Sequence, residues 1–186
     1  MTLFKKSTRS LLCALAVSSA LLAGCAGPQI SDYAAEKPTL DLRQYFTGTV
    51  DAYGIFTDRS GKVVKRFTVE MICTWTGAPG QEVGVLDEYF TYSDGSKDRR
   101  VWTLKRGADG KYLGTAGDVL GVANGEVKGN AFRWGYTLLL PIDGKTIEVQ
   151  FDDWMYLMND KIMLNKADMS KFGFKLGEVT LTFVKR

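Results

Sequence analysis

The stretch Phe67-Thr68-Val69-Glu70-Met71-Ile72-Cys73-Thr74-Trp75 decides the fold, because its side chains alternate between apolar and mostly polar. Every odd-numbered position in it is apolar, whereas Thr68, Glu70 and Thr74 occupy even-numbered positions. Successive side chains of a β-strand point to opposite faces of the sheet. A period of two therefore predicts a strand that buries one face and leaves the other in water.

The same period recurs along the chain on both sides of this strand. The positions that share a face in these runs are Leu86, Glu88, Phe90 and Tyr92; Arg100, Trp102 and Leu104; Phe132, Trp134, Tyr136, Leu138 and Leu140; Ile147, Val149, Phe151, Asp153 and Met155; and Val179, Leu181 and Phe183. Short polar dipeptides between the runs favour hairpin turns, since Gly, Asn and Asp tolerate positive φ. These dipeptides are Ser60-Gly61, Asp94-Gly95, Asp109-Gly110, Asn124-Gly125, Asp143-Gly144 and Asn159-Asp160.

Strands joined by tight turns predict an all-β, antiparallel up-and-down meander of about 8–10 strands over residues 46–186. A meander of that length tends to close, because open edges invite aggregation. We expect a closed or strongly curved, lipocalin-like barrel, with a two-sheet sandwich as the alternative. Residues 165–172 form the one candidate helix. Mid-strand charges such as Glu70 and Arg133 disfavour a barrel that spans the outer membrane, whose lipid-facing band is apolar.

The N-terminus reads as a signal peptide, residues 1–24. Lys5, Lys6 and Arg9 precede an apolar run from Leu11 to Leu22 that is shorter than the about 20 residues of a membrane-spanning helix. The run ends in Leu22-Ala23-Gly24-Cys25, which resembles a bacterial lipobox. This resemblance implies lipidation of Cys25 and cleavage before it. The alternative is an ordinary secretory signal that contains a cysteine by chance.

Residues 25–45 are expected to combine the acylated cysteine with a tether, because they are polar, contain Pro28 and Pro38, and show no sustained periodicity. Near the end of this segment, apolar side chains are expected to fold back on the barrel as a short plug. They are Leu40, Leu42, Tyr45 and Phe46.

Composition excludes several kinds of chemistry. The chain contains no histidine, which removes Ser-His-Asp and Cys-His catalysis and the commonest transition-metal ligand. Without the leader, 21 of its 24 basic side chains remain against 21 acidic ones, and this neutral balance argues against binding to nucleic acid. Only Cys73 remains as a free thiol, on an apolar face where it is inert. We therefore expect no metal and no cofactor.

The candidate site lies on the inward face of the strands. Glu88, Arg100 and Asp153 share that face with apolar residues, and an isolated buried charge is costly. We therefore expect them to form a polar cluster inside an aromatic cavity. The alternative is a β-bulge that turns one or more of them to solvent.

Aromatic residues supply most of the expected cavity wall. They are Phe67, Trp75, Phe90, Trp102, Trp134, Tyr136 and Phe151. A barrel of about eight strands either fills with such side chains or holds one small ligand. Simple core packing and a cavity for an apolar ligand both remain open at this point.

Two further segments are Arg99-Arg100-Val101-Trp102-Thr103-Leu104 and, more distinctive, Phe151-Asp152-Asp153-Trp154-Met155-Tyr156-Leu157. With them the chain resembles a family of bacterial lipoproteins of unknown function, DUF3833. The resemblance implies a periplasm-facing lipoprotein with no assigned activity or catalytic residues. Ala26 after the acylated cysteine implies the outer membrane. An association of the family with genes for membrane fatty-acid modification implies lipid handling.

Three functions follow from these observations. The first is a membrane-anchored protein on the periplasmic face of the outer membrane that binds a lipid or fatty-acyl ligand in the barrel. The second is a structural lipoprotein that docks on an envelope partner, which the sequence does not identify, without a ligand. The third is a hydrolase or isomerase that uses inward carboxylates such as Glu88 and Asp153.

Overall fold

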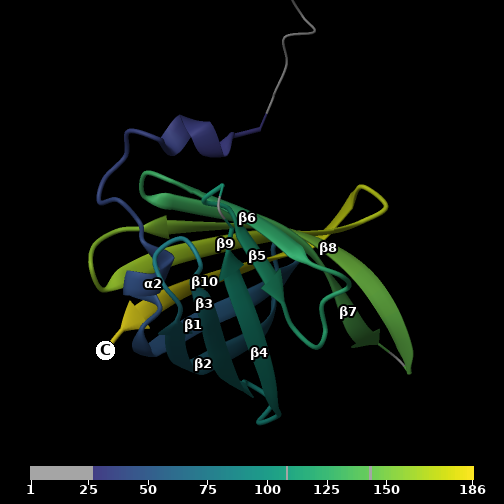
Figure 1. Ribbon diagram of the computed structural model, residues 1–186. Coiled ribbons are helices and arrows are strands. Elements are labelled where there is room, and N and C mark those ends of the chain that lie inside the picture. The colour runs from purple at the N-terminus through teal and green to yellow at the C-terminus, as the bar shows by residue number, and fades with distance from the viewer. Residues whose placement is uncertain (1–26, 108, 143) are drawn as a thin grey trace, which may run out of the picture.

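The computed structural model describes residues 27–107, 109–142 and 144–186. They form a closed barrel of ten antiparallel strands in the order β1-β10-β9-β8-β7-β6-β5-β4-β3-β2 (Figure 1). Each strand pairs with the next in sequence, and β10 closes the barrel against β1. The expected closed meander is confirmed, and the sandwich is wrong. The expected signal peptide and the expected lipidation site at Cys25 lie outside the described residues.

The strands differ in length, and the two shortest, of 4 and 6 residues, are neighbours in the barrel. Their bounds are β1 (Gly48–Asp58), β2 (Val63–Thr76), β3 (Val83–Tyr92), β4 (Lys97–Arg106), β5 (Tyr112–Thr115), β6 (Ala123–Lys128), β7 (Ala131–Ile142), β8 (Lys145–Leu157), β9 (Ile162–Lys171) and β10 (Phe174–Lys185). The connection between β5 and β6, residues 116–122, runs beside β7, where the Leu120 amide donates to the Thr137 carbonyl at 2.8 Å.

Strand β2 shows how the sequence period sets the interior. Val69, Met71 and Cys73 are buried, while Thr68 and Glu70 between them are exposed. Burial raises the pKa of the Cys73 thiol to about 12, so the thiol stays protonated and unreactive.

One expected turn is wrong. Asn124-Gly125 lies inside β6, with Gly125 opposite Trp134 in the ladder. A Cβ atom at Gly125 would stand 2.5 Å from the Phe132 ring, so glycine is needed there to admit an aromatic side chain rather than to form a turn. The chain turns instead at Gly129, whose φ is +52°.

The candidate helix over residues 165–172 is also wrong, because most of this segment belongs to β9. Met163, Asn165, Ala167 and Met169 are buried, and the residues between them are exposed. Their period of two is that of a strand, and pairing with β8 and β10 on either side satisfies the backbone of β9.

A short helix closes one end of the barrel. Helix α2 (Leu42–Tyr45) is capped by Asp41, whose side chain accepts from the Gln44 amide at 2.9 Å. Leu42 is fully buried, and the Tyr45 hydroxyl donates to the Lys161 carbonyl at 2.9 Å. Leu40 and Phe46 are buried as well. These residues form the plug expected from the sequence.

The preceding chain lies against the outside of the barrel (Figure 1). The 3-10 helix η1 (Ile30–Tyr33) places the Tyr33 ring 5.6 Å from Trp154 and 5.3 Å from Tyr156 on β8. From Ile30 onward, the segment expected as a tether therefore contacts the barrel wall. Within the described ranges, no helix is long and apolar enough to cross a membrane.

Candidate functional site

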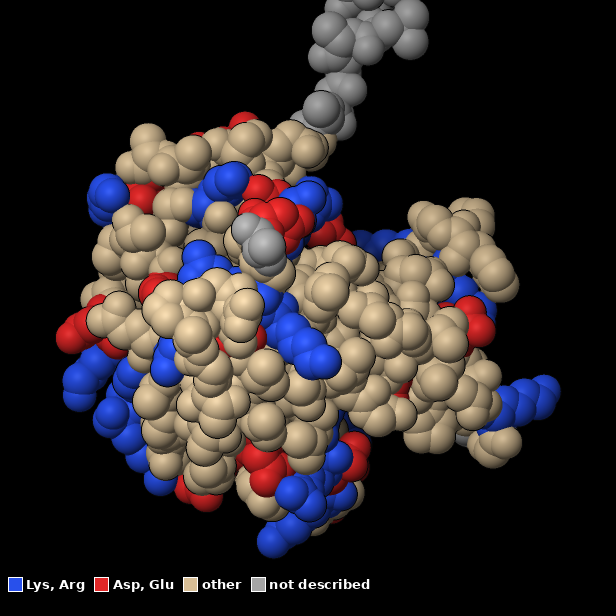
Figure 2. Space-filling model, viewed as in Figure 1, with Lys and Arg blue, Asp and Glu red and all other residues tan. Residues whose placement is uncertain are grey.

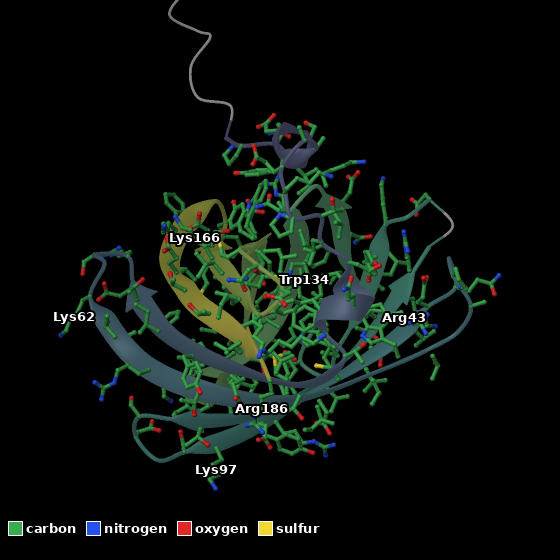
Figure 3. All side chains as sticks on the ribbon, turned by 90° about the vertical axis from the view of Figure 1, so that its left-hand side faces the viewer. Arg43, Lys62, Lys97, Trp134, Lys166 and Arg186 are labelled. Atoms are coloured by element: carbon green, nitrogen blue, oxygen red, sulfur yellow. The ribbon has the colours of Figure 1, made fainter. Side chains whose placement is uncertain are left out.

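A cavity of about 610 Å³ occupies the inside of the barrel. Of the ten residues predicted to line it, the structure places nine on its wall: Phe67, Glu88, Phe90, Arg100, Trp102, Trp134, Tyr136, Phe151 and Asp153. In Figure 3, Trp134 lies in the middle of the molecule, with strands on either side of it. The inward residues thus leave an internal space in addition to packing against one another.

Trp75 is the predicted residue that does not line this cavity. Its indole N–H donates to the Phe46 carbonyl at 2.6 Å, so the ring belongs to the plugged end. The sequence period shows correctly that Trp75 points inward. It does not show how deep along the barrel axis an inward residue lies.

Toward the end of the barrel that carries the β1–β2, β3–β4, β7–β8 and β9–β10 hairpins, the cavity wall is apolar apart from Lys65, and the carboxyl groups lie deeper. On β3, Phe90 and Tyr92 lie between Glu88 and the β3–β4 hairpin. On β8, Val149 and Phe151 lie between the β7–β8 hairpin and Asp153. A ligand that enters from the hairpin end therefore meets apolar and aromatic side chains before it reaches the carboxyl groups.

Asp153 is the most enclosed of these carboxyl groups, with 5% of its surface exposed. It accepts hydrogen bonds from the Trp134 indole N–H and the Tyr136 hydroxyl, both at 2.9 Å, and from the Asn165 side-chain amide. Burial raises the pKa of Asp153 to about 6, although these three donors act in the opposite direction. Both carboxyl oxygens of Asp153 thus accept hydrogen bonds from neighbouring side chains of the barrel.

Glu88 has fewer partners. Its carboxylate lies 3.9 Å from the Arg100 guanidinium, and its side chain is 12% exposed. Burial raises the pKa of Glu88 to about 7, against the opposing effect of Arg100. Near neutral pH this carboxyl group can therefore both donate and accept a hydrogen bond.

Arg100 is held mainly by a residue that the sequence did not reveal. Its guanidinium donates to Asp118 at 2.7–3.1 Å, and this bidentate pair ties the 116–122 connection to β4. Burial acts to lower the pKa of Arg100, but the hydrogen bonds to Asp118 and the charge of Glu88 raise it above its usual value. Glu88 and Arg100 are neighbours as expected, whereas Asp153 has its own set of partners.

Sequence reasoning missed Asp118 and Asn165 as parts of this interior. Asp118 sits in an irregular connection, and no periodic signal marks it. Asn165 could have been found from the alternation of β9, which places it between buried Met163 and Ala167.

The residues that line the cavity carry two carboxyl groups, Glu88 and Asp153, and two cations, Lys65 and Arg100. Arg100 pairs with Asp118 of the 116–122 connection and lies near Glu88, whereas Lys65 lies toward the start of β2. Across the described part of the chain, no group of three or more His, Cys, Asp or Glu residues is arranged to hold a metal ion. The arrangement can hold an elongated apolar molecule and offer Glu88 to a polar atom on it.

Comparison with solved structures places the fold among known barrels. The structure is similar to that of the S-type phycobiliprotein lyase CPES from Guillardia theta, with a TM-score of 0.61. The match covers 86% of this chain and 98% of the lyase at 9% sequence identity, so it concerns the fold alone.

A search of curated proteins gives no match. The family model described as "Protein of unknown function (DUF3833)" matches residues 19–185, which is nearly the whole chain. It covers both segments, 99–104 and 151–157, that carry the resemblance noted from the sequence. The chain therefore belongs to the DUF3833 family.

Proposed function

We propose that this protein is a lipid-anchored lipoprotein of the bacterial envelope that binds or carries one apolar, lipid-like ligand in its barrel. The observation that carries the proposal is the internal cavity of about 610 Å³ with its largely aromatic and aliphatic wall. Ligand pockets of roughly 300–1,000 Å³ are typically apolar with a few placed polar groups. Glu88 and Arg100 supply such groups here.

The two ends of the barrel suggest how a ligand enters. Leu42, Tyr45 and Phe46 fill the plugged end and are almost completely buried. Lys65, Ile142 and Leu176 line the cavity at the hairpin end, and each keeps part of its surface in solvent. The hairpin end is therefore the mouth.

The charges inside the barrel restrict the polar part of the ligand. The Arg100 guanidinium is already paired with Asp118, so a free carboxylate on the ligand would meet Glu88 and Asp153 without an unpaired cation beside them. A hydroxyl, amide, ester or amine fits Glu88 better. Among fatty-acyl ligands, we favour those whose carboxyl group is esterified or amidated.

The proposed anchor rests on the lipobox. Acylation of Cys25 would attach the chain to the periplasmic face of the outer membrane, beside a supply of apolar ligands. Metabolic labelling with an alkyne palmitate should mark the full-length protein and leave the Cys25→Ala variant unmarked. Labelling of both, or of neither, would contradict the anchor.

Ligand binding is tested with matched variants on β10. Val179 lines the cavity, and its neighbour Thr180 points to the exposed outer face. Val179→Trp would occupy ligand space, whereas Thr180→Trp would add the same side chain outside. We expect the first to weaken binding of a pyrene-labelled fatty alcohol at least tenfold and the second to leave it unchanged.

Native mass spectrometry of the purified full chain gives an independent measurement. A bound lipid of defined mass that disappears in Val179→Trp supports the proposal. Equal binding by both variants, with both folded by circular dichroism, would show that the ligand lies outside the barrel.

A further inference from the structure

The β9–β10 hairpin ends in a cluster of exposed apolar side chains. Phe172 is 85% exposed, Phe174 75% and Leu176 39%. The hairpin projects from the body of the molecule at the upper right of Figure 1, and its tip is mostly tan in the space-filling view (Figure 2). We call these three residues the apolar tip.

Phe172 is unusual in its backbone as well as in its exposure. Its φ is +52°, and it is the one non-glycine residue with positive φ among those described. Gly173 follows with a φ of +80°. Turns of this kind normally carry Asn, Asp or Gly at the first position, because a bulky side chain is strained there. The fold itself therefore gains nothing from a phenylalanine at this position.

Two other hairpins at the mouth are polar. The β1–β2 turn reads Asp58-Arg59-Ser60-Gly61-Lys62, and the β3–β4 turn reads Ser93-Asp94-Gly95-Ser96-Lys97. Their tips carry no large apolar side chain. The β7–β8 hairpin carries Ile142, which is 43% exposed, so the β9–β10 hairpin differs from it in presenting two aromatic rings at its tip.

Basic residues flank the apolar tip. The Lys171 ammonium lies 5.2 Å from the Phe172 ring centroid. Lys175 follows Phe174 and pairs with Asp168 and Glu178 further up the hairpin, and Lys166 pairs with Glu178 as well. Three lysines against two carboxylates leave this hairpin with a net positive charge. Aromatic rings with lysines beside them are typical of segments that enter the boundary between lipid headgroups and acyl chains.

We propose that the apolar tip docks the mouth of the barrel on an anionic phospholipid surface. The rings of Phe172 and Phe174 enter the headgroup–acyl boundary, and Lys171 remains among the phosphates. A narrow hairpin tip suits a lipid layer, which deforms around it, better than a protein partner, which would need about 800 Å² of complementary surface. This docking depends on the outer surface alone and does not require a ligand in the cavity.

The proposal is tested with a fluorescent probe at the tip. In the full chain with Cys13 and Cys25 replaced by serine, Phe172→Cys is labelled with an environment-sensitive fluorophore. Buried Cys73 stays unlabelled. Leu113→Cys is the control, because Leu113 on β5 is 45% exposed and lies far from the mouth along the strand register. Vesicles of equal parts phosphatidylglycerol and phosphatidylcholine are compared with vesicles of phosphatidylcholine alone.

We expect the label at position 172 to shift to shorter wavelength and to brighten at least twofold with the anionic vesicles. The label at position 113 should change little, and Lys171→Glu should reduce the response at position 172. No response at position 172, or equal responses at both positions, would overturn the proposal. An equal response with neutral vesicles would overturn its electrostatic part.

A protein partner remains a distinct outcome. A label at position 172 that responds to a lipid-free envelope extract but not to vesicles would contradict docking on lipid. Binding of the pyrene-labelled alcohol in vesicle-free buffer reports on the cavity separately, so failure of docking and failure of ligand binding are distinguishable.

Discussion

Replacing Glu88 with glutamine should change the free energy of unfolding in a way that depends on pH. The difference between the variant and the unmodified protein should favour the variant more at pH 8 than at pH 5. The side chain keeps its shape in Glu88→Gln but can no longer ionise. Arg100 keeps its bidentate hydrogen bonds to Asp118 at 2.7–3.1 Å, so the change leaves no buried cation without a partner.

The magnitude follows from the proton affinity of Glu88. Burial raises the pKa of this carboxyl group from 4.5 to about 7. Since a tenfold change in proton affinity corresponds to about 1.4 kcal/mol, ionised Glu88 costs the folded state about 3 kcal/mol. Between pH 4.5 and pH 7 the folded protein holds a proton that the unfolded chain has lost. Stability therefore falls as pH rises through this range, and about 2 kcal/mol of the loss lies between pH 5 and pH 8.

The assay is urea unfolding of the two proteins at pH 5 and at pH 8, followed by tryptophan fluorescence. We expect the free energy of unfolding of Glu88→Gln, relative to the unmodified protein, to be about 2 kcal/mol more favourable at pH 8 than at pH 5. Asp153, with its pKa raised to about 6 by burial, should leave both proteins with a smaller slope of the same sign. Glu148→Gln on the exposed face of β8 is the control and should change neither value. A relative stability that is the same at both pH values would show that Glu88 is solvated like a surface glutamate.

Three further predictions concern the fold. Leu42→Ala in the plug removes a fully buried side chain and should cost about 2–5 kcal/mol, measured by urea unfolding. Gly125→Ala should destabilise the barrel by about 1–3 kcal/mol in the same assay, because the new Cβ would meet the Phe132 ring at 2.5 Å. The control is Gly135→Ala, which should cost less, because Gly135 is exposed and has no close side-chain neighbour. Phe172→Asn should raise the melting temperature, because Asn tolerates the φ of +52° and relieves about 1 kcal/mol of strain. When the fluorophore is placed at Phe174→Cys, its response to anionic vesicles should be smaller in the Phe172→Asn variant than in the protein that keeps Phe172.

The period of two in the sequence was sufficient to predict which side chains face inward. Glu88, Arg100 and Asp153 all point into the barrel, because the register of their strands has no bulge at these positions. The bulges that do occur lie at the hairpin ends of β1 and β10, between Phe56 and Thr57 and between Lys175 and Gly177. Alternation therefore predicts the inner face well where the strand is long and paired on both sides.

Depth along the barrel and the content of irregular connections could not be predicted in the same way. Trp75 shares its face with Phe67, yet it reaches the plug rather than the cavity. Asp118 contacts Arg100 only because the 116–122 connection folds beside β7, an arrangement set by tertiary hydrogen bonds. The Asn124-Gly125 dipeptide resembles a turn, but the lack of a side chain at Gly125 serves the packing of Phe132. In each case the deciding contact is distant in sequence.

An anchor at Cys25 and the apolar tip would together orient the barrel. Only four residues separate Cys25 from Ile30 in η1, so the chain between them spans at most about 17 Å. Helix η1 and the β9–β10 hairpin both lie in the upper half of Figure 1, whereas the polar β3–β4 hairpin lies at the bottom. A membrane on the upper side could thus hold the acylated N-terminus and receive Phe172 at the same time. The arc of the mouth beside β10 would then adjoin the lipid, and Leu176, which lines the cavity there, would be among the first side chains that an entering acyl chain meets.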